Sequence, residues 1–87
     1  MKLELSREFE KQYKKLNQKQ AEKVAQTLGN FLKDKSIVSL RYHALRGEWQ
    51  GHYSISAGGD LRIHIRYASE AIVLVVAIGS HSQLYNP

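Results

Sequence analysis

The sequence predicts an α+β fold in which an N-terminal strand and a helical hairpin pack on a small, mainly antiparallel, twisted sheet. First, apolar residues in the first third of the chain recur at the three- and four-residue spacing of helices. Second, apolar and polar residues alternate over residues 61–67, and third, an apolar, β-branched run follows at residues 71–78. Together these observations predict the element order β-α-α-β-β-β.

Two helices are predicted ahead of the sheet. Residues 2–5 alternate polar and apolar, as in a short strand, and Ser6 is a suitable cap for the helix that follows. Asn17, with Gln20 three residues later, resembles the capping box of a second helix. The apolar stripes of the two helices are Phe9, Tyr13 and Leu16, and then Ala21, Val24, Ala25, Leu28, Phe31 and Leu32. These stripes predict an antiparallel hairpin whose role is packing.

The second half of the chain is predicted to form the sheet. After an irregular segment anchored to the core by Ile37, Val38 and Leu40, residues 49–56 are predicted as a strand. The Ala-Gly-Gly-Asp sequence at residues 57–60 predicts a tight hairpin turn, because glycine accepts positive φ angles. In the next strand, one face is expected to carry Leu61, Ile63, Ile65 and Tyr67, and the other Arg62, His64 and Arg66. Residues 80–85 are expected to form a short turn or helical cap.

Length and composition predict one domain over residues 1–87 and exclude several classes of protein. The absence of cysteine excludes disulfides and thiolate nucleophiles. The longest apolar run is far shorter than the ~20 residues that cross a bilayer, and no signal peptide is recognised. We therefore expect a soluble, cytoplasmic protein without membrane contact. No phosphate-binding glycine motif or zinc-ligand spacing is present, although there are four histidines.

The formal charge of +5 is unevenly distributed. Residues 1–36 hold nine Lys and Arg against five Asp and Glu, mostly lysines on the predicted helices, whereas all four histidines lie in residues 37–87. A basic surface favours an anionic partner, either nucleic acid or an acidic protein segment. A solvated helix face is the alternative interpretation of the lysines.

Three short motifs resemble those of a known family. The segment His-Ala-Leu-Arg-Gly-Glu-Trp at residues 43–49 is followed by Asp-Leu-Arg-Ile at residues 60–63 and Gly-Ser-His-Ser-Gln-Leu-Tyr at residues 79–85. In this order they resemble the RelE/ParE superfamily of bacterial toxins, specifically its YafQ branch. The helical hairpin ahead of the sheet agrees with the RelE-like microbial RNase fold, so the resemblance covers nearly the whole chain.

The resemblance implies the toxin of a type II toxin–antitoxin system. Such toxins are ribosome-dependent endoribonucleases, or mRNA interferases, that inhibit translation by cleaving messenger RNA, and a cognate antitoxin holds them inactive. They use neither a metal nor another cofactor. Their chemistry is attack of a ribose 2′-hydroxyl on the adjacent phosphorus, which needs a proton acceptor, a proton donor and positive charge beside the phosphate.

The resemblance also assigns roles to individual residues. His81 matches the family's terminal histidine and is the first choice for general acid, while His43 and Asp60 are each candidates for the base or for a group that orients it. Arg62 matches an arginine suited to phosphate, and Tyr85 an aromatic that contacts the RNA. Further candidate substrate-binding residues are Arg41, Arg46, His64 and Arg66.

Structural roles are the alternatives for several of these residues. Asp60 can satisfy turn amides, and Arg62 can pair with Glu48 or Glu70. Trp49 is expected to be a packing residue. His52 and His64 have no family counterpart and are expected either at the surface or behind the groups that contact substrate.

Three positions depart from the family pattern. Ser56 stands in place of a second active-site histidine, Leu61 in place of an aromatic residue, and Ala77 in place of an arginine on the last strand. The loss at Ala77 removes a charge that would stabilise the transition state, for which Arg62, Arg66 or His64 are the candidate replacements. The alternative function is therefore a binding module of the same fold, either a ParE-like gyrase inhibitor or a catalytically weakened antitoxin-binding protein.

Overall fold

In the computed structural model, which describes residues 1–85, the chain forms a five-stranded sheet with the strand order β1-β5-β4-β3-β2. The elements are β1 (Lys2–Leu5), α1 (Arg7–Lys14), α2 (Gln18–Lys33), η1 (Val38–Leu40), β2 (His43–Ala44), η2 (Gly47–Trp49), β3 (Tyr53–Ser56), β4 (Leu61–Tyr67), β5 (Ile72–Ser80) and α3 (His81–Tyr85), where η marks a 3-10 helix. Strand β1 pairs parallel with β5, and the other neighbours are antiparallel. The predicted α+β fold class is confirmed.

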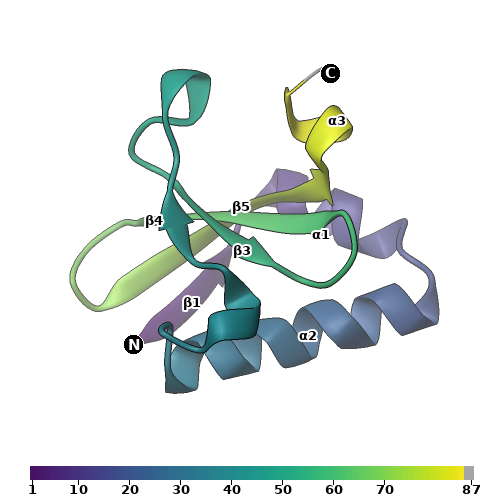
Figure 1. Cartoon of the computed structure of the whole chain (residues 1–87), viewed down its shortest axis with the longest axis horizontal. Helices are drawn as coiled ribbons and strands as arrows, with labels where there is room; N and C mark the ends of the chain where they lie inside the picture. The colour runs from purple at the N-terminus through teal and green to yellow at the C-terminus, as the bar shows by residue number, and fades with distance from the viewer. Residues whose placement is uncertain (86–87) are drawn as a thin grey trace.

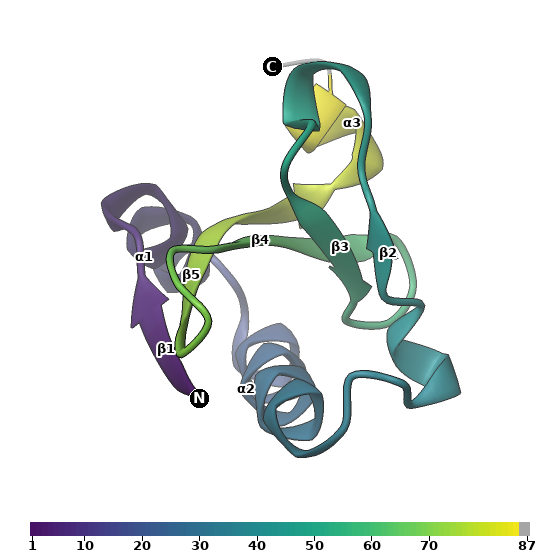
Figure 2. The same ribbon diagram turned by 90° about the vertical axis from the view of Figure 1, so that its left-hand side faces the viewer.

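The helical hairpin and the loop that carries η2 lie on different sides of the sheet (Figure 1). Helix α2 runs beneath one face, and α1 lies beside β1 and β5. Seen along the sheet, α3 and the loop that carries η2 rise together from the opposite face (Figure 2). One face is therefore covered by the helical hairpin, whereas the other faces the C-terminal helix and this loop.

Both predicted helix caps are present. The Ser6 hydroxyl accepts a hydrogen bond from the Phe9 amide at 3.0 Å, which satisfies one of the free amides at the start of α1. At the start of α2, the Asn17 side chain accepts from the Gln20 amide at 2.8 Å, and the Gln20 side chain accepts from the Asn17 amide at 3.2 Å. This reciprocal pair is the capping box that the sequence predicts.

The hydrophobic core lies between the helical hairpin and the sheet. Its members are Phe9, Val24, Leu28, Phe31, Leu40, Ile55, Ala57, Ile63, Ile65, Val73, Val75 and Ile78. Most of the predicted stripe residues lie on the core side of the helices, but Ala25 and Leu32 are exposed because they lie on the solvent side of α2, and the polar Thr27 is buried instead. Val38, which was expected to anchor its segment, is instead 89 % exposed because it lies in the short η1 turn, where only Leu40 is buried.

A β-bulge at Val76 changes the pattern of β5. His64 of β4 pairs with Ala77, but the next residue, Ile65, pairs with Val75, so Val76 has no partner on β4. The Ser6 hydroxyl donates to the Val76 carbonyl at 2.6 Å, so the cap residue of α1 satisfies the bulged strand. The bulge places Val75 and Ile78 on the same, helix-facing side, which explains why β5 is apolar at successive positions.

The segment from residue 43 to residue 56 differs from the prediction of one strand over residues 49–56. Residues 43–44 form the short edge strand β2, Gly47–Trp49 forms the 3-10 helix η2, and β3 begins only at Tyr53. Gly47 and Gly51 have φ angles of +67° and +89°, which turn the chain on both sides of Trp49. The predicted hairpin turn is present, with positive φ at both glycines of residues 58–59. No helix within residues 1–85 is long and apolar enough to cross a membrane.

Candidate functional site

The strand register places the predicted site residues that lie in strands, His43, Arg62, His64 and Arg66, on the face opposite α2. His43, Ser54, His64 and Ala77 are consecutive cross-strand partners from β2 to β5, so they form one row across the sheet. A second row, one step nearer to α3, contains Ser56, Arg62 and Gly79. Because alternate residues of these strands belong to the core, both rows face away from the helical hairpin.

His64 is buried at the centre of this face. Its ring meets the Trp49 ring nearly at right angles with a centroid distance of 4.3 Å, and the Tyr85 ring lies 5.7 Å away. Only 1 % of His64 is exposed, and its Nδ1 atom is buried without a hydrogen-bond partner among the described residues. Of the two positions expected for His64, the surface position is therefore wrong. His64 lies behind the exposed groups of the face, because Trp49 and Tyr85 cover it.

Burial is the main cause that lowers the pKa of His64 to about 4. The charges of His52, His43 and His81 lower this pKa further. At neutral pH the His64 imidazole is therefore uncharged. It cannot replace the positive charge of the arginine that is absent at position 77.

His81 is the first residue of α3, immediately after β5. Its side chain is exposed, and its ring centroid lies 4.6 Å from that of Tyr85, which is half-buried. Ser80 pairs with Leu61, so Asp60, the exposed residue before Leu61, lies at the same end of the sheet as His81. The fold thus brings His81, Tyr85 and the Asp60 turn to one end of the polar face.

His43 and Arg62 occupy fixed positions on this face. The Nδ1 atom of His43 is 2.7 Å from the Arg41 carbonyl oxygen, while its side chain remains exposed. Arg62 is half-buried and donates through Nη1 to the carbonyl of Gly59 at 2.9 Å and to the hydroxyl of Ser56 at 3.4 Å. The hairpin turn therefore holds the guanidinium, in place of the expected alternative partners Glu48 or Glu70.

The remaining predicted arginines are exposed at different parts of the face. Arg41 follows η1 with a φ angle of +48°, and Arg46 precedes η2. Arg66 pairs with Leu74, one step farther from α3 than His64. The structure does not gather these three side chains around His81.

A cavity of about 360 Å³ opens beside Ala77. It is lined by Glu48, Trp49, His52, Ala77, Gln83 and Leu84. The indole nitrogen of Trp49 donates to the Leu84 carbonyl at 3.3 Å, which ties the η2 loop to α3. Trp49 thus has the packing role that we expected, and its side chain forms a wall of the site.

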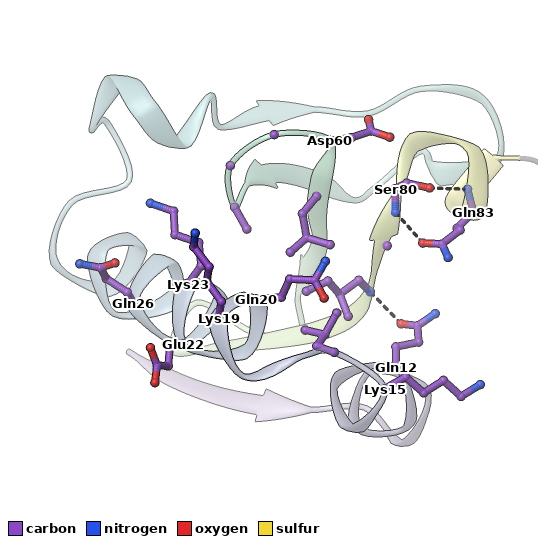
Figure 3. Close-up of a pocket in the computed structure, with 17 residues that line it drawn as sticks. Gln12, Lys15, Lys19, Gln20, Glu22, Lys23, Gln26, Asp60, Ser80 and Gln83 are labelled. Carbon is purple, nitrogen blue, oxygen red and sulfur yellow. Dashed lines mark hydrogen bonds between the residues drawn. The ribbon is translucent and has the colours of Figure 1, made fainter.

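A larger cavity of about 900 Å³ lies on the other side, between the helical hairpin and the β3–β4 turn (Figure 3). Lys19 and Lys23 extend from α2 toward this turn, and Gln12, Ser80 and Gln83 line the opposite wall (Figure 3). These three residues were not predicted to belong to a site. For Ser80 and Gln83, the sequence pattern that could have indicated a role is the Ser-x-x-Gln spacing, which is typical of a capping box.

The chain has the RelE/YoeB-like fold, in which an N-terminal strand and two helices precede the rest of a five-stranded sheet. A family model described as the bacterial toxin of type II toxin–antitoxin systems, YafQ, matches residues 1–86. The chain therefore belongs to the YafQ family of toxins. No curated protein sequence matches it significantly.

Solved structures of similar fold agree with this assignment. YafQ from Escherichia coli strain BL21(DE3) has a TM-score of 0.76 and 20 % identity, over 97 % of both chains. The YoeB/ParE toxin from Agrobacterium tumefaciens has a TM-score of 0.77 and 18 % identity, over 93 % of this chain and 99 % of the other. The RelBE2 toxin–antitoxin complex from Mycobacterium tuberculosis has a TM-score of 0.75 and 18 % identity, over 92 % and 96 %. At these identities the likeness shows the fold.

Proposed function

We propose that this toxin is a metal-independent, ribosome-dependent mRNA endonuclease. The observation that supports this proposal is the arrangement of the polar face, where His43 and buried His64 share one row, Arg62 lies in the adjacent row, and exposed His81 begins α3 at the end of the face. Proton-transfer groups and a fixed positive charge are the two requirements for cleavage through a ribose 2′-hydroxyl. A surface that only binds a protein needs neither.

The proposed reaction forms a bond between the 2′ oxygen and phosphorus and breaks the bond from phosphorus to the 5′ oxygen. Asp60 or His43 accepts the 2′ proton, and His81 donates a proton to the leaving 5′ oxygen. The products are a 2′,3′-cyclic phosphate and a free 5′-hydroxyl. Arg62 stabilises the charge on the non-bridging oxygens, and Tyr85 contacts the RNA. Arg41, Arg46 and Arg66 are exposed and are the proposed contacts to the RNA backbone, whereas buried His64 does not contact the RNA and supports the site from behind.

A cognate antitoxin is the proposed protein partner. The related RelBE2 structure is a toxin–antitoxin complex. In this chain, the cavity beside α2 is lined by Lys15, Lys19 and Lys23, which favour an acidic antitoxin segment through charge complementarity. Binding there places the antitoxin directly beside the Asp60 turn, which lines the same cavity.

Expression of the toxin alone in bacteria tests the proposed activity. We expect growth arrest and new mRNA ends that map to the ribosomal decoding site, and His81→Ala should lower the cleavage rate by about 10²- to 10⁴-fold, the usual contribution of a general acid. Lys33→Ala, an exposed change at the end of α2, is the control and should leave cleavage unchanged.

Two results would favour the alternative functions. DNA-damage signalling with intact mRNA would indicate a ParE-like gyrase inhibitor. Normal growth, with antitoxin binding retained, would indicate a catalytically weakened binding protein, as the alanine at position 77 allows.

A further inference from the structure

Helix α3 is a single turn of five residues, His81–Tyr85, and it carries His81 at its first position. One helical turn is unstable in isolation, because fixing its backbone costs more free energy than its few hydrogen bonds return. The position of His81 therefore depends on the contacts that hold α3 against the end of β5.

A reciprocal pair of hydrogen bonds closes the start of α3 (Figure 3). The Ser80 hydroxyl accepts from the Gln83 amide at 3.1 Å, and the Gln83 side-chain oxygen accepts from the Ser80 amide at 2.8 Å. This is a capping box, and the first helical residue inside it is His81. The two bonds fix the direction in which the chain leaves the strand.

The absence of a side chain at Gly79 lets the Gln83 side chain lie close to the end of β5. A Cβ atom on Gly79 would lie 3.0 Å from the Gln83 side-chain oxygen and 3.2 Å from its Cβ. Gln83 also lines both the 900 Å³ cavity and the 360 Å³ cavity, so its side chain stands between the helical hairpin and the polar face. A shift of Gln83 would therefore move α3 relative to the sheet.

Helix α1 holds the strand end from the other side. The Gln12 side-chain oxygen accepts from the Ile78 amide at 2.7 Å (Figure 3), two residues after the bulge and two residues before Ser80. This bond joins the hairpin to the part of β5 from which α3 begins. A continuous set of contacts thus runs from Gln12 through Ile78 to the capping box.

We propose that Ser80 and Gln83 are positioning residues that set the location of the His81 imidazole, with Gln12 holding the strand end beneath them. The proposal rests on the proposed function of His81 as proton donor. Its physical basis is that a reacting group displaced by about 1 Å can lose roughly a hundredfold in rate. The capping box therefore affects the rate of the chemical step more than RNA binding, to which Tyr85 of α3 and the arginines outside α3 contribute together.

The kinetic test measures single-turnover cleavage of mRNA on translating ribosomes. Gln83→Ala and Ser80→Ala should lower the rate constant by roughly ten- to a hundredfold, with a much smaller change in the half-saturating toxin concentration. Ser80→Thr keeps a capping hydroxyl and should restore the rate. Gln18→Ala is the matched control, because Gln18 is an exposed glutamine of α2 that lines neither cavity.

A second measurement does not depend on nuclease activity. The rings of His81 and Tyr85 lie 4.6 Å apart, so NMR should show a ring-current shift of the His81 imidazole protons. Gln83→Ala should abolish this shift, whereas Gln18→Ala should retain it, with circular dichroism confirming that both variants are folded.

The two measurements separate this proposal from the proposed function. If the unmodified toxin cleaves mRNA and Gln83→Ala cleaves it equally fast, the positioning role is wrong. If the unmodified toxin cleaves no mRNA, the nuclease proposal fails, and the ring-current shift still decides whether the capping box fixes His81. Retention of that shift in Gln83→Ala would overturn the proposal in either case.

Discussion

Replacing His64 by phenylalanine should make the fold less sensitive to acid. The pKa of this buried imidazole is lowered to about 4 in the folded protein, whereas an unfolded histidine titrates near 6.5. On acidification through this interval, the unfolded chain takes up a proton that the folded chain does not. The free energy of unfolding therefore falls as the pH falls from about 6.5 to about 4. Phenylalanine keeps an aromatic ring against Trp49 but has no group to protonate.

The expected size of the effect follows from the two pKa values. Each pH unit of difference is worth about 1.4 kcal/mol, so His64 should account for a loss of about 3 kcal/mol in the free energy of unfolding between pH 7 and pH 4. This is a large fraction of the stability of a small domain, which is typically about 5–15 kcal/mol. A difference of this size is easily measured.

Urea unfolding followed by far-ultraviolet circular dichroism, at several pH values from 7 to 4, measures this effect. The free energy of unfolding should fall about 3 kcal/mol further in the unmodified protein than in His64→Phe. His43→Gln, which removes an exposed histidine, should keep most of the original pH dependence. The change in packing caused by phenylalanine shifts the curve equally at all pH values, so only the slope is interpreted. Equal slopes for the unmodified protein and His64→Phe would refute the reasoning.

Two further predictions concern the backbone. Gly79→Ala should lower the free energy of unfolding by about 1–3 kcal/mol, because the new Cβ would lie only 3.0 Å from the Gln83 side-chain oxygen. Gly29→Ala in α2 should raise it by about 0.5–1 kcal/mol, because no atom of a neighbouring element lies within 4 Å of the new Cβ and alanine favours the helix. Thermal unfolding measures both, and changes of the same sign would contradict the packing argument. Asn17→Ala should remove the capping box of α2 and cost about 1 kcal/mol in urea unfolding, and an unchanged midpoint would show that the box adds nothing.

The local elements could be predicted from the sequence alone. The caps at Ser6 and Asn17, the apolar stripes of the hairpin and the glycine turn at residues 58–59 all involve residues at most four positions apart. Such features depend on helix periodicity, side-chain capping and backbone φ angles, which a linear sequence displays directly. The candidates His81 and Arg62 came from motifs and from the family resemblance, and their chemical roles remain predictions.

The arrangement of the polar face could not be predicted from the sequence, because it depends on tertiary contacts. The bulge at Val76 is satisfied by Ser6, 70 residues away in the sequence, and His64 is buried because Trp49 and Tyr85 meet over it. The row that joins His43 to His64 depends on the register of three strands. Alternation along one strand indicates which residues share a face. It does not indicate which residue of the next strand each one pairs with, or which side chains cover it. Those properties arise from contacts between distant segments, and they decide which histidine is exposed and which is buried.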